Sequence, residues 1–277
     1  MRIFLALVAM LIAAAAAAVF AGSSSWNRAT RASVATLGSP RGSAAAYSIA
    51  DLADLPEPVA RYFRRVLRDG QPIARSATAT QDAEFFLNGA WRPLRATQEF
   101  VTSPPGFVWD ARIGMAPLVS AYVRDSYAGG TGSMIASALG VYPIVNQTAT
   151  PELNAGALQR YLGEAIWVPT ALLPSPSITW TAVDDRSATA TLRDGATTVS
   201  LVFGFDSADG FVTSIEGDRF KENAGTYTLQ PWRIQCDEYQ ERDGMMIPLH
   251  AEVGWVTAGK VEPYWRGRIT SITYRYN

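Results

Sequence analysis

The sequence has little of the side-chain chemistry on which many enzymes and metal proteins depend. Its 277 residues include one cysteine, Cys236, and one histidine, His250. A single cysteine excludes an internal disulfide, and a metal cluster or a Ser-His-Asp triad would rest on the one histidine. Cys236 precedes two acidic residues, whereas a reactive thiol needs a cationic neighbourhood, so we interpret it as a buried apolar side chain. We therefore identify no catalytic residue, no metal ligand and no cofactor.

An excess of charge of either sign is also missing. The chain has 24 lysine and arginine residues against 25 aspartate and glutamate residues, so no strong positive field is present to attract nucleic acid. Only Lys221 and Lys260 are lysines. Hydrophobic residues make up 48% of the chain, which supplies a large core and excludes general disorder. These proportions are typical of one large globular domain.

What the sequence does contain is a long apolar run at its N-terminus. Residues 3–21 carry no charge, Arg2 precedes them, and small polar residues follow. A run of ~18 or more apolar residues is long enough to cross a bilayer, and the positive start with a small-x-small end is typical of a secretory signal. We predict that residues 1–22 are a signal peptide or a membrane anchor. The protein is then expected in the cell envelope, either anchored in the membrane or exported.

The charges that flank this run leave cleavage and retention both open. Arg28, Arg31 and Arg41 lie downstream, against Arg2 upstream. Positive charges favour the cytoplasmic side of a membrane, so this balance weakens the case for an uncleaved anchor whose domain lies outside. A mature N-terminus near Gly22 would indicate cleavage.

Composition divides the rest of the chain in two. Residues 23–54 are mostly small and polar without periodicity, and we predict that they form a flexible linker. A single β-rich domain is predicted over residues 55–277. It is expected to open with a helix whose apolar face repeats at helical spacing and which Gly70 closes. The residues on that face are Val59, Tyr62, Phe63, Val66 and Leu67.

Beyond Gly70 the apolar period changes to two, which indicates β-strands. Asn-Gly at residues 88–89 predicts a hairpin turn. A second helix is expected after Thr150, an N-cap residue followed by proline, and it must end before Pro169. The predicted strands are 77–87, 91–101, 107–113, 118–127, 133–145, 177–183, 187–192, 198–205, 211–220, 227–241, 246–256 and 264–276.

These elements predict a mainly β fold of the β-rich α+β class. We expect a large curved antiparallel sheet, or half-barrel, of about a dozen strands with two principal helices. A sheet of that size tends to curl because its strands twist. A curled sheet with a helix in its mouth forms an apolar container.

Aromatic residues and isolated charges gather in two stretches, residues 98–111 and 160–173. Arg160 and Glu164 are one helical turn apart, which allows an ion pair. We predict that an apolar or lipid-like ligand binds in a pocket of the curved sheet. The predicted ligand-binding residues are Phe100, Phe107, Trp109, Arg160, Tyr161, Glu164 and Trp167.

Two other interpretations of the function remain. The first is an enzyme of unknown class that uses carboxylates such as Asp110, Asp125 or Glu164, which would have to converge in one cleft. The second is a structural or partner-binding module of the envelope, which would show an exposed apolar patch without a pocket. The sequence specifies no protein partner.

Three segments carry a resemblance to a known family. They are PPGFVWDA at residues 104–111, RDSYAGG at 124–130 and RYLGEAIWVPTALL at 160–173. Together they resemble an uncharacterised bacterial family of unknown function over residues 55–276. The resemblance implies a fold distantly similar to the lipoprotein-carrier type, a curved antiparallel half-barrel with helices closing its concave side. It implies no activity and no catalytic residue, and lipid or lipoprotein handling follows from it only by analogy of fold.

Overall fold

A computed structural model describes residues 1–38, 45–223 and 225–276 of the chain. Within these ranges, thirteen strands form one sheet in the order β6-β5-β4-β3-β2-β1-β13-β12-β11-β10-β9-β8-β7. Every neighbouring pair is antiparallel, which confirms the predicted mainly β fold. The strands are β1 (Ser76–Leu87), β2 (Ala90–Val101), β3 (Gly106–Ala116), β4 (Val119–Ala128), β5 (Thr131–Ala138), β6 (Tyr142–Thr148), β7 (Ile178–Asp184), β8 (Ser187–Asp194), β9 (Thr197–Phe205), β10 (Val212–Asn223), β11 (Thr226–Arg242), β12 (Met245–Thr257) and β13 (Lys260–Arg275).

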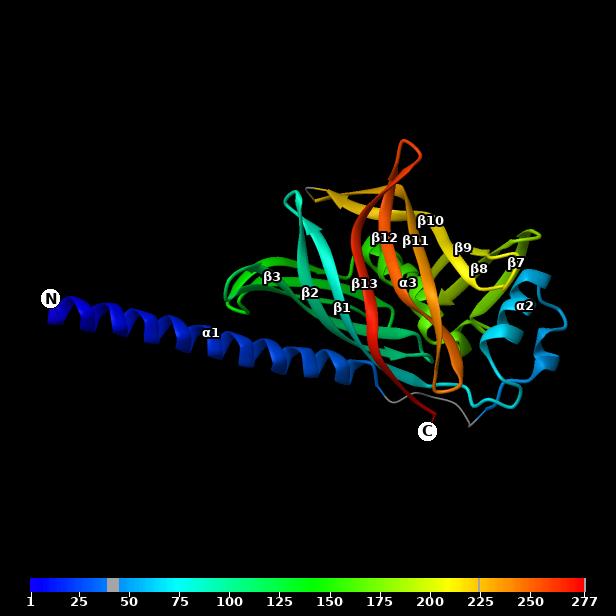
Figure 1. Cartoon of the computed structure of the whole chain (residues 1–277), viewed down its shortest axis with the longest axis horizontal. Coiled ribbons are helices and arrows are strands. Elements are labelled where there is room, and N and C mark those ends of the chain that lie inside the picture. Colours follow the sequence, from blue (N-terminus) through cyan, green and yellow to red (C-terminus); the bar gives the residue numbers. More distant parts are fainter. Residues whose placement is uncertain (39–44, 224, 277) are drawn as a thin grey trace.

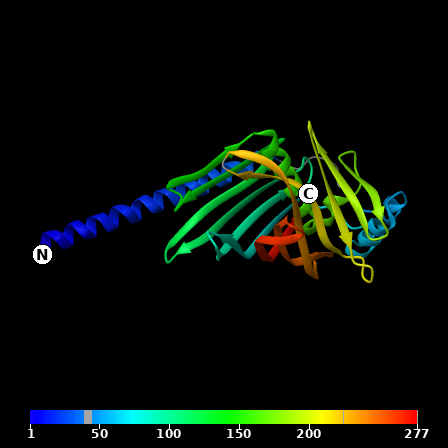
Figure 2. The same ribbon diagram turned by 90° about the horizontal axis from the view of Figure 1, so that it is seen from above.

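The sheet consists of two meanders that meet where β1 pairs with β13. The chain passes from edge strand β6 to edge strand β7 through α3 (Pro151–Glu164) and the short helices η2 (Ala165–Trp167) and η3 (Pro169–Leu172). Helix α3 contacts β3, β4 and β5 of the first meander and β9 and β10 of the second. It therefore lies on the concave side of a sheet that curves around it (Figure 1 and Figure 2).

Local signals start α3 where the sequence predicts, and glycines let it approach the sheet closely. The Thr150 hydroxyl accepts a hydrogen bond from the Leu153 backbone at 3.1 Å, and Pro151 occupies the first turn. A Cβ at Gly163 would lie 2.8 Å from Cδ1 of Ile234, and one at Gly132 of β5 would lie 2.7 Å from the carbonyl oxygen of Leu153. A larger residue at Gly132 would push α3 away from the concave face, because it would meet the helix backbone, whereas one at Gly163 would require the Ile234 side chain to move.

Helix α2 (Glu57–Val66) covers the second meander. Its predicted apolar face is buried, with Tyr62 and Phe63 fully enclosed. The Tyr62 ring lies 5.8 Å from that of Phe205, and the Phe63 ring lies 6.3 Å from that of Trp180. The helix ends at Val66, before the predicted stop at Gly70, because Leu67 is already extended.

The segment 133–145, predicted as one strand, contains two. Strand β5 ends at Ala138 and β6 begins at Tyr142, with Leu139 and Gly140 between them at φ values of 55° and 70°. Leucine rarely adopts a positive φ, so the apolar sequence gave no sign of this turn. The extra hairpin makes β6 the edge strand of the sheet.

The predicted linker over 23–54 also differs from the structure. Residues 23–36 continue α1 (Arg2–Thr36), and Ile49–Leu52 form η1, a short helix capped by Ser48. Residues 39–44 lie outside the described residues. Helix α1 passes along β3 and β4 on the face opposite α3. The alternation of side chains along β3 shows this, because Trp109 points towards α3 while Asp110 contacts α1.

Trp26 fastens α1 to this convex face. The indole is buried, its Nε1 donates to Oδ1 of Asp110 at 2.8 Å, and its ring meets Tyr122 edge-on at 5.7 Å. One face of the helix thus carries apolar residues at helical spacing, from Trp26 through Val34 to Leu37, the last two packing with neighbours of β2 and β3. The residues between them are small and polar, so the sequence pattern of this helical face is similar to that of a linker.

We expect Trp26→Ala to release residues 23–37 from the sheet without unfolding the domain. The buried indole, its hydrogen bond and its ring contact are worth about 3 kcal/mol of local docking free energy. Trypsin should then cleave after Arg28 and Arg31 at a much higher rate, as measured by intact mass against time. Asn27→Ala is the matched control, because it loses one exposed hydrogen bond from Arg112. Equal cleavage of the two variants would contradict the docking role of Trp26.

Candidate functional site

An ion triad lies where α3 meets the first meander. Arg160 of α3 places Nη1 2.6 Å from Oδ2 of Asp125 on β4, and its Nε is 2.8 Å from Oε1 of Glu164, one helical turn away. All three side chains are less than a fifth exposed. Burial would lower the pKa of Arg160, but the carboxylates of Glu164 and Asp125 outweigh it and raise the pKa. The fold therefore holds Arg160 charged and balances it with two carboxylates.

A chain of hydrogen bonds extends the triad across three strands. Gln98 of β2 donates to Oε2 of Glu164 at 2.7 Å and accepts from Nε2 of Gln81 on β1 at 3.1 Å. Gln81 in turn accepts from Nε1 of Trp109 on β3 at 2.8 Å. Both glutamines are buried, so each satisfied amide avoids the cost of an unpaired polar group. We call these residues, with the ion triad, the polar network.

Aromatic rings enclose the polar network. The Arg160 guanidinium lies 5.1 Å from the centre of the Phe107 ring and 4.8 Å from that of Trp109, within range of a cation–π interaction. Phe100 stacks on Tyr161 with centroids 4.3 Å apart. These rings are almost completely buried. The aromatic residues therefore form a packed floor under α3 and not an empty pocket.

A second group of aromatic side chains lies further along the concave face, beyond α3. We call Phe85, Trp232, Trp255 and Tyr264 the aromatic strip. Tyr264 lies 5.9 Å from Phe85 and 6.0 Å from Trp255 between ring centres, and its hydroxyl accepts from Nε1 of Trp232 at 3.0 Å. Trp232 faces α3, since a Cβ on Gly163 would lie 3.6 Å from it. Phe85, Trp255 and Tyr264 remain partly exposed.

Two cations border the aromatic strip. Arg219 lies 5.1 Å from the Trp232 ring centre, and Lys221 lies 5.1 Å from that of Trp255. Arg219 also donates to the carbonyl oxygen of Gly156 on α3 at 3.2 Å. Within the described ranges, neither cation forms an ion pair with a carboxylate. Their charge is available to a ligand on this face.

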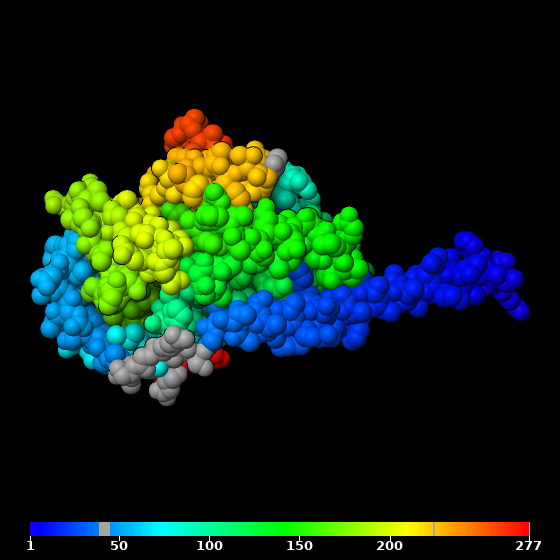
Figure 3. All heavy atoms as spheres, turned by 180° about the vertical axis from the view of Figure 1, so that it is seen from behind, coloured from blue at the N-terminus to red at the C-terminus, as the bar shows by residue number. Residues whose placement is uncertain are grey.

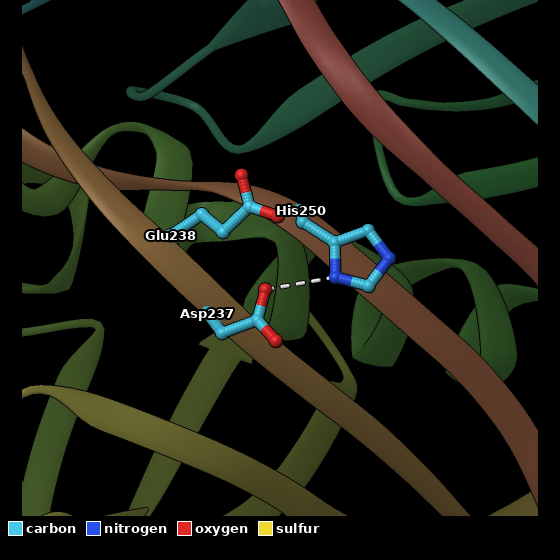
Figure 4. Close-up of side chains that lie close together, drawn as sticks. All are labelled: Asp237, Glu238 and His250. Carbon is cyan, nitrogen blue, oxygen red and sulfur yellow. Dashed lines mark hydrogen bonds and ion pairs between the residues drawn. The ribbon is translucent and has the colours of Figure 1, made fainter.

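A third cluster, Asp237, Glu238 and His250, has side chains of the kinds that bind metal ions (Figure 4). One ligand atom from each lies within 4.8 Å of the others. However, Nδ1 of His250 is bonded to Oδ1 of Asp237 at 2.8 Å, and the Arg268 guanidinium is paired with the Glu238 carboxylate. A guanidinium on that carboxylate competes with a metal cation. On the convex face these residues form one hydrogen bond, His250 with Asp237, and one ion pair, Glu238 with Arg268.

The comparison with protein families identifies the chain over most of its length. The model of a family of unknown function, DUF6920, matches residues 53–274. The chain belongs to the DUF6920 family. The predicted membership of an uncharacterised family is thereby confirmed. The DUF6920 region contains the polar network and the aromatic strip, whereas α1 precedes it. Among curated proteins, none matches the chain.

The solved structures that are similar to this DUF6920 chain are distant from it in sequence. A putative outer membrane lipoprotein-sorting protein domain from Vibrio parahaemolyticus is 9% identical, covers 82% of this chain and 92% of its own, and has a TM-score of 0.43. A LolA superfamily protein from Nitrosomonas europaea is 9% identical, with 79% and 92% covered and a TM-score of 0.43. A DUF1329 family protein from Desulfovibrio piger is 8% identical, with 73% and 86% covered and a TM-score of 0.39.

The structure places most of the predicted site residues together. Phe100, Phe107, Trp109, Arg160, Tyr161 and Glu164 all belong to the polar network or its aromatic floor. Trp167 lies further along in η2, where its carbonyl oxygen accepts from the Tyr274 hydroxyl at 2.7 Å. Their role in ligand binding stays a prediction.

Sequence reasoning missed Gln81, Gln98 and the whole aromatic strip. A signal for the glutamines exists, because Gln81 follows Ala77 and Ala79 at inward positions of β1, where a polar residue breaks an apolar series. The aromatic strip left no such signal, since its members come from four strands and Phe85 of β1 is far in sequence from the other three.

The three carboxylates suggested for an enzyme do not share a cleft. Asp125 and Glu164 face each other across Arg160 on the concave side. Asp110 lies on the convex side, where it accepts from Trp26 and pairs with Arg112 at 2.6 Å. These three carboxylates therefore do not converge in one cleft, as catalysis by this set would require.

Proposed function

We propose that this protein is a cell-envelope protein that holds an apolar or lipid-like ligand on the concave face of its sheet, beside α3. The main evidence for this proposal is the aromatic strip. Three of its rings remain partly exposed although they adjoin the main core. Exposed aromatic rings next to a concave apolar surface are typical of ligand-binding faces.

The arrangement of the aromatic strip supports an elongated ligand. Its rings come from the neighbouring strands β1, β13, β12 and β11, so they follow one another across the sheet. An acyl chain laid along this face would cover apolar area at ~25 cal/mol per Å². Extended apolar ligands are therefore favoured over compact polar ones.

Arg219 and Lys221 suggest the chemistry of the ligand's head group. Each lies over a ring of the strip, at its border. A carboxylate or phosphate group there would gain charge-assisted hydrogen bonds while the chain stays on the rings. We therefore propose an anionic head group.

The residues predicted from the sequence lie at the inner end of the same face, below α3. Phe100, Phe107, Trp109 and Tyr161 are too buried to touch a ligand while α3 is seated. We propose that they line the ligand's apolar end when α3 shifts, and that the Arg160–Asp125 ion pair holds α3 in place until then.

The N-terminal helix agrees with an envelope location. Helix α1 is long and apolar enough to cross a membrane, a test that a signal sequence near the N-terminus also passes. Either role would deliver the domain to a compartment in which lipids and lipidated proteins are handled.

The fluorescent fatty acid cis-parinaric acid provides the test. We expect saturable binding to the full chain, weakened roughly tenfold in Trp255→Ala, because a lost ring contact of about 1.4 kcal/mol is a factor of ten. Leu229→Ala is the matched control, since Leu229 is also a large apolar residue but is exposed on the outer face. Equal affinity of both variants, or no saturable binding, would overturn the proposal. Lipid extraction of protein purified without detergent would then identify the natural ligand.

A further inference from the structure

Two hairpin tips of the first meander expose large apolar side chains to solvent. The β3–β4 tip presents Leu118, which is fully exposed, and Val119. The β5–β6 tip presents Val141, Tyr142 and Ile144, which are between half and three-quarters exposed. Exposed apolar side chains grouped in this way mark an interaction surface and not ordinary scatter.

Helix α1 passes the β5–β6 tip at the end of its apolar run. A Cβ on Gly22 would lie 2.5 Å from Cγ2 of Val141 and 2.9 Å from the carbonyl oxygen of Gly140. Residues 2–18 of the helix are exposed along their whole length, and burial against the domain begins at Val19. Figure 3 shows this part of α1, in dark blue, projecting away from the body of the molecule.

The apolar part of α1 has the length of a bilayer core. At ~1.5 Å per residue, the segment from Arg2 to Ala21 is about 30 Å long, the thickness of the hydrocarbon region. If this segment spans a membrane, the bilayer surface falls near Gly22. The β5–β6 tip then lies at that surface.

The sequence around both tips suits such a position. No charged residue occurs between Arg112 and Arg124, or between Asp125 and Glu152. By contrast, the β7–β8 and β11–β12 tips carry Asp184, Asp185 and Asp243. Charge-free tips enter the interfacial layer without the cost of burying a charge, and Tyr142 has the amphipathic ring favoured there.

We propose that α1 is retained as a membrane anchor and that the β3–β4 and β5–β6 tips dock in the interfacial layer of the same bilayer. Trp26 and Leu37 hold the helix against the convex face, so the domain cannot turn freely about its anchor. The helix and the tips together fix which part of the domain faces the lipid. This inference rests on the membrane location of α1 and not on ligand binding by the concave face.

The experiment measures the depth of a single fluorophore on the full chain in vesicles of phosphatidylcholine and phosphatidylglycerol. Leu118→Cys is labelled with the environment-sensitive dye NBD. The native Cys236 is buried, which raises its thiol pKa to about 12 and keeps it unlabelled. Val183→Cys provides the matched control, because Val183 is exposed at the opposite edge of the sheet.

We expect the label at position 118 to be quenched severalfold more strongly by lipids with a shallow doxyl group than by aqueous iodide. The label at position 183 should show the reverse. Identical quenching at both positions would overturn docking of the tips. Intact mass of protein from membranes should include Met1 or Arg2, whereas an N-terminus near Gly22 would overturn retention of the anchor. Fatty-acid binding can fail without changing either readout, so the two proposals are tested separately.

Discussion

Replacing Arg160 with methionine should destabilise the domain by about 3 kcal/mol. The substitution keeps the apolar stem but leaves Asp125 and Glu164 facing each other at 15% and 13% exposure without their common cation. Two unpaired carboxylates in a water-poor place repel each other and lose solvation. Urea unfolding followed by tryptophan fluorescence at pH 7 measures the loss.

The dependence of this loss on pH identifies its cause. In Arg160→Met the two carboxylates repel each other with no cation between them, so neutralising either one relieves the repulsion in the folded protein. The deficit against the wild type should therefore shrink at mildly acidic pH. A deficit that grows on acidification would contradict the charge explanation.

Two further variants separate the charge effect from lost packing. Arg64→Met removes an exposed pair with Glu57, in which the side chains are 46% and 71% exposed, and should change stability by less than about 1 kcal/mol. The triple variant Arg160→Met, Asp125→Asn and Glu164→Gln removes all charge from the triad and should recover part of the loss. If Arg160→Met loses no more stability than Arg64→Met, the buried triad does not stabilise the fold more than an exposed ion pair does.

Replacing Trp109 with alanine should cost about 3–5 kcal/mol, the range found for large aromatic side chains in a core. Trp109 is 4% exposed, lies under the Arg160 guanidinium and donates to Gln81. The alanine variant thus opens a cavity beneath α3 and removes one end of the polar network. Thermal or urea unfolding provides the measurement.

Trp109→Phe isolates the hydrogen bond from the packing. Phenylalanine keeps most of the ring but leaves the Gln81 carbonyl oxygen without its donor, which costs about 1–3 kcal/mol. Combining Trp109→Phe with Arg160→Met should give a loss that differs from the sum, because the residues share one network. Strict additivity, or a Trp109→Phe variant as stable as the wild type, would show that the network does not act as a unit.

Local signals in the sequence were sufficient for most of the sheet. The period-two pattern from residue 77 onward predicted its strands, and Asn88-Gly89 marks the β1–β2 turn. Thr150 and Pro151 predicted the start of α3. These features act through neighbouring residues, so they can be recognised without knowing the fold. The turn at Leu139-Gly140 was not predicted, because leucine rarely adopts a positive φ.

The candidate site was predictable in part, for the same reason. The helical spacing of Arg160 and Glu164 predicted their ion pair, which the structure contains. The meeting of Arg160 with Asp125 joins residues 35 positions apart, and it depends on α3 lying over β4. The contact of Trp26 with Asp110 joins residues 84 positions apart across the convex face. No local pattern encodes either contact.

The sequence by itself determined the class of the fold, the two principal helices, the apolar N-terminal segment and the scarcity of catalytic side chains, because composition and short-range periodicity carry that information. Only the tertiary structure decided that α1 docks beyond its apolar run, that α3 packs on the concave face, and that four strands combine Phe85, Trp232, Trp255 and Tyr264 into one strip. Strand order and the face of each side chain produce these contacts, and both are set when the whole sheet closes around its helix.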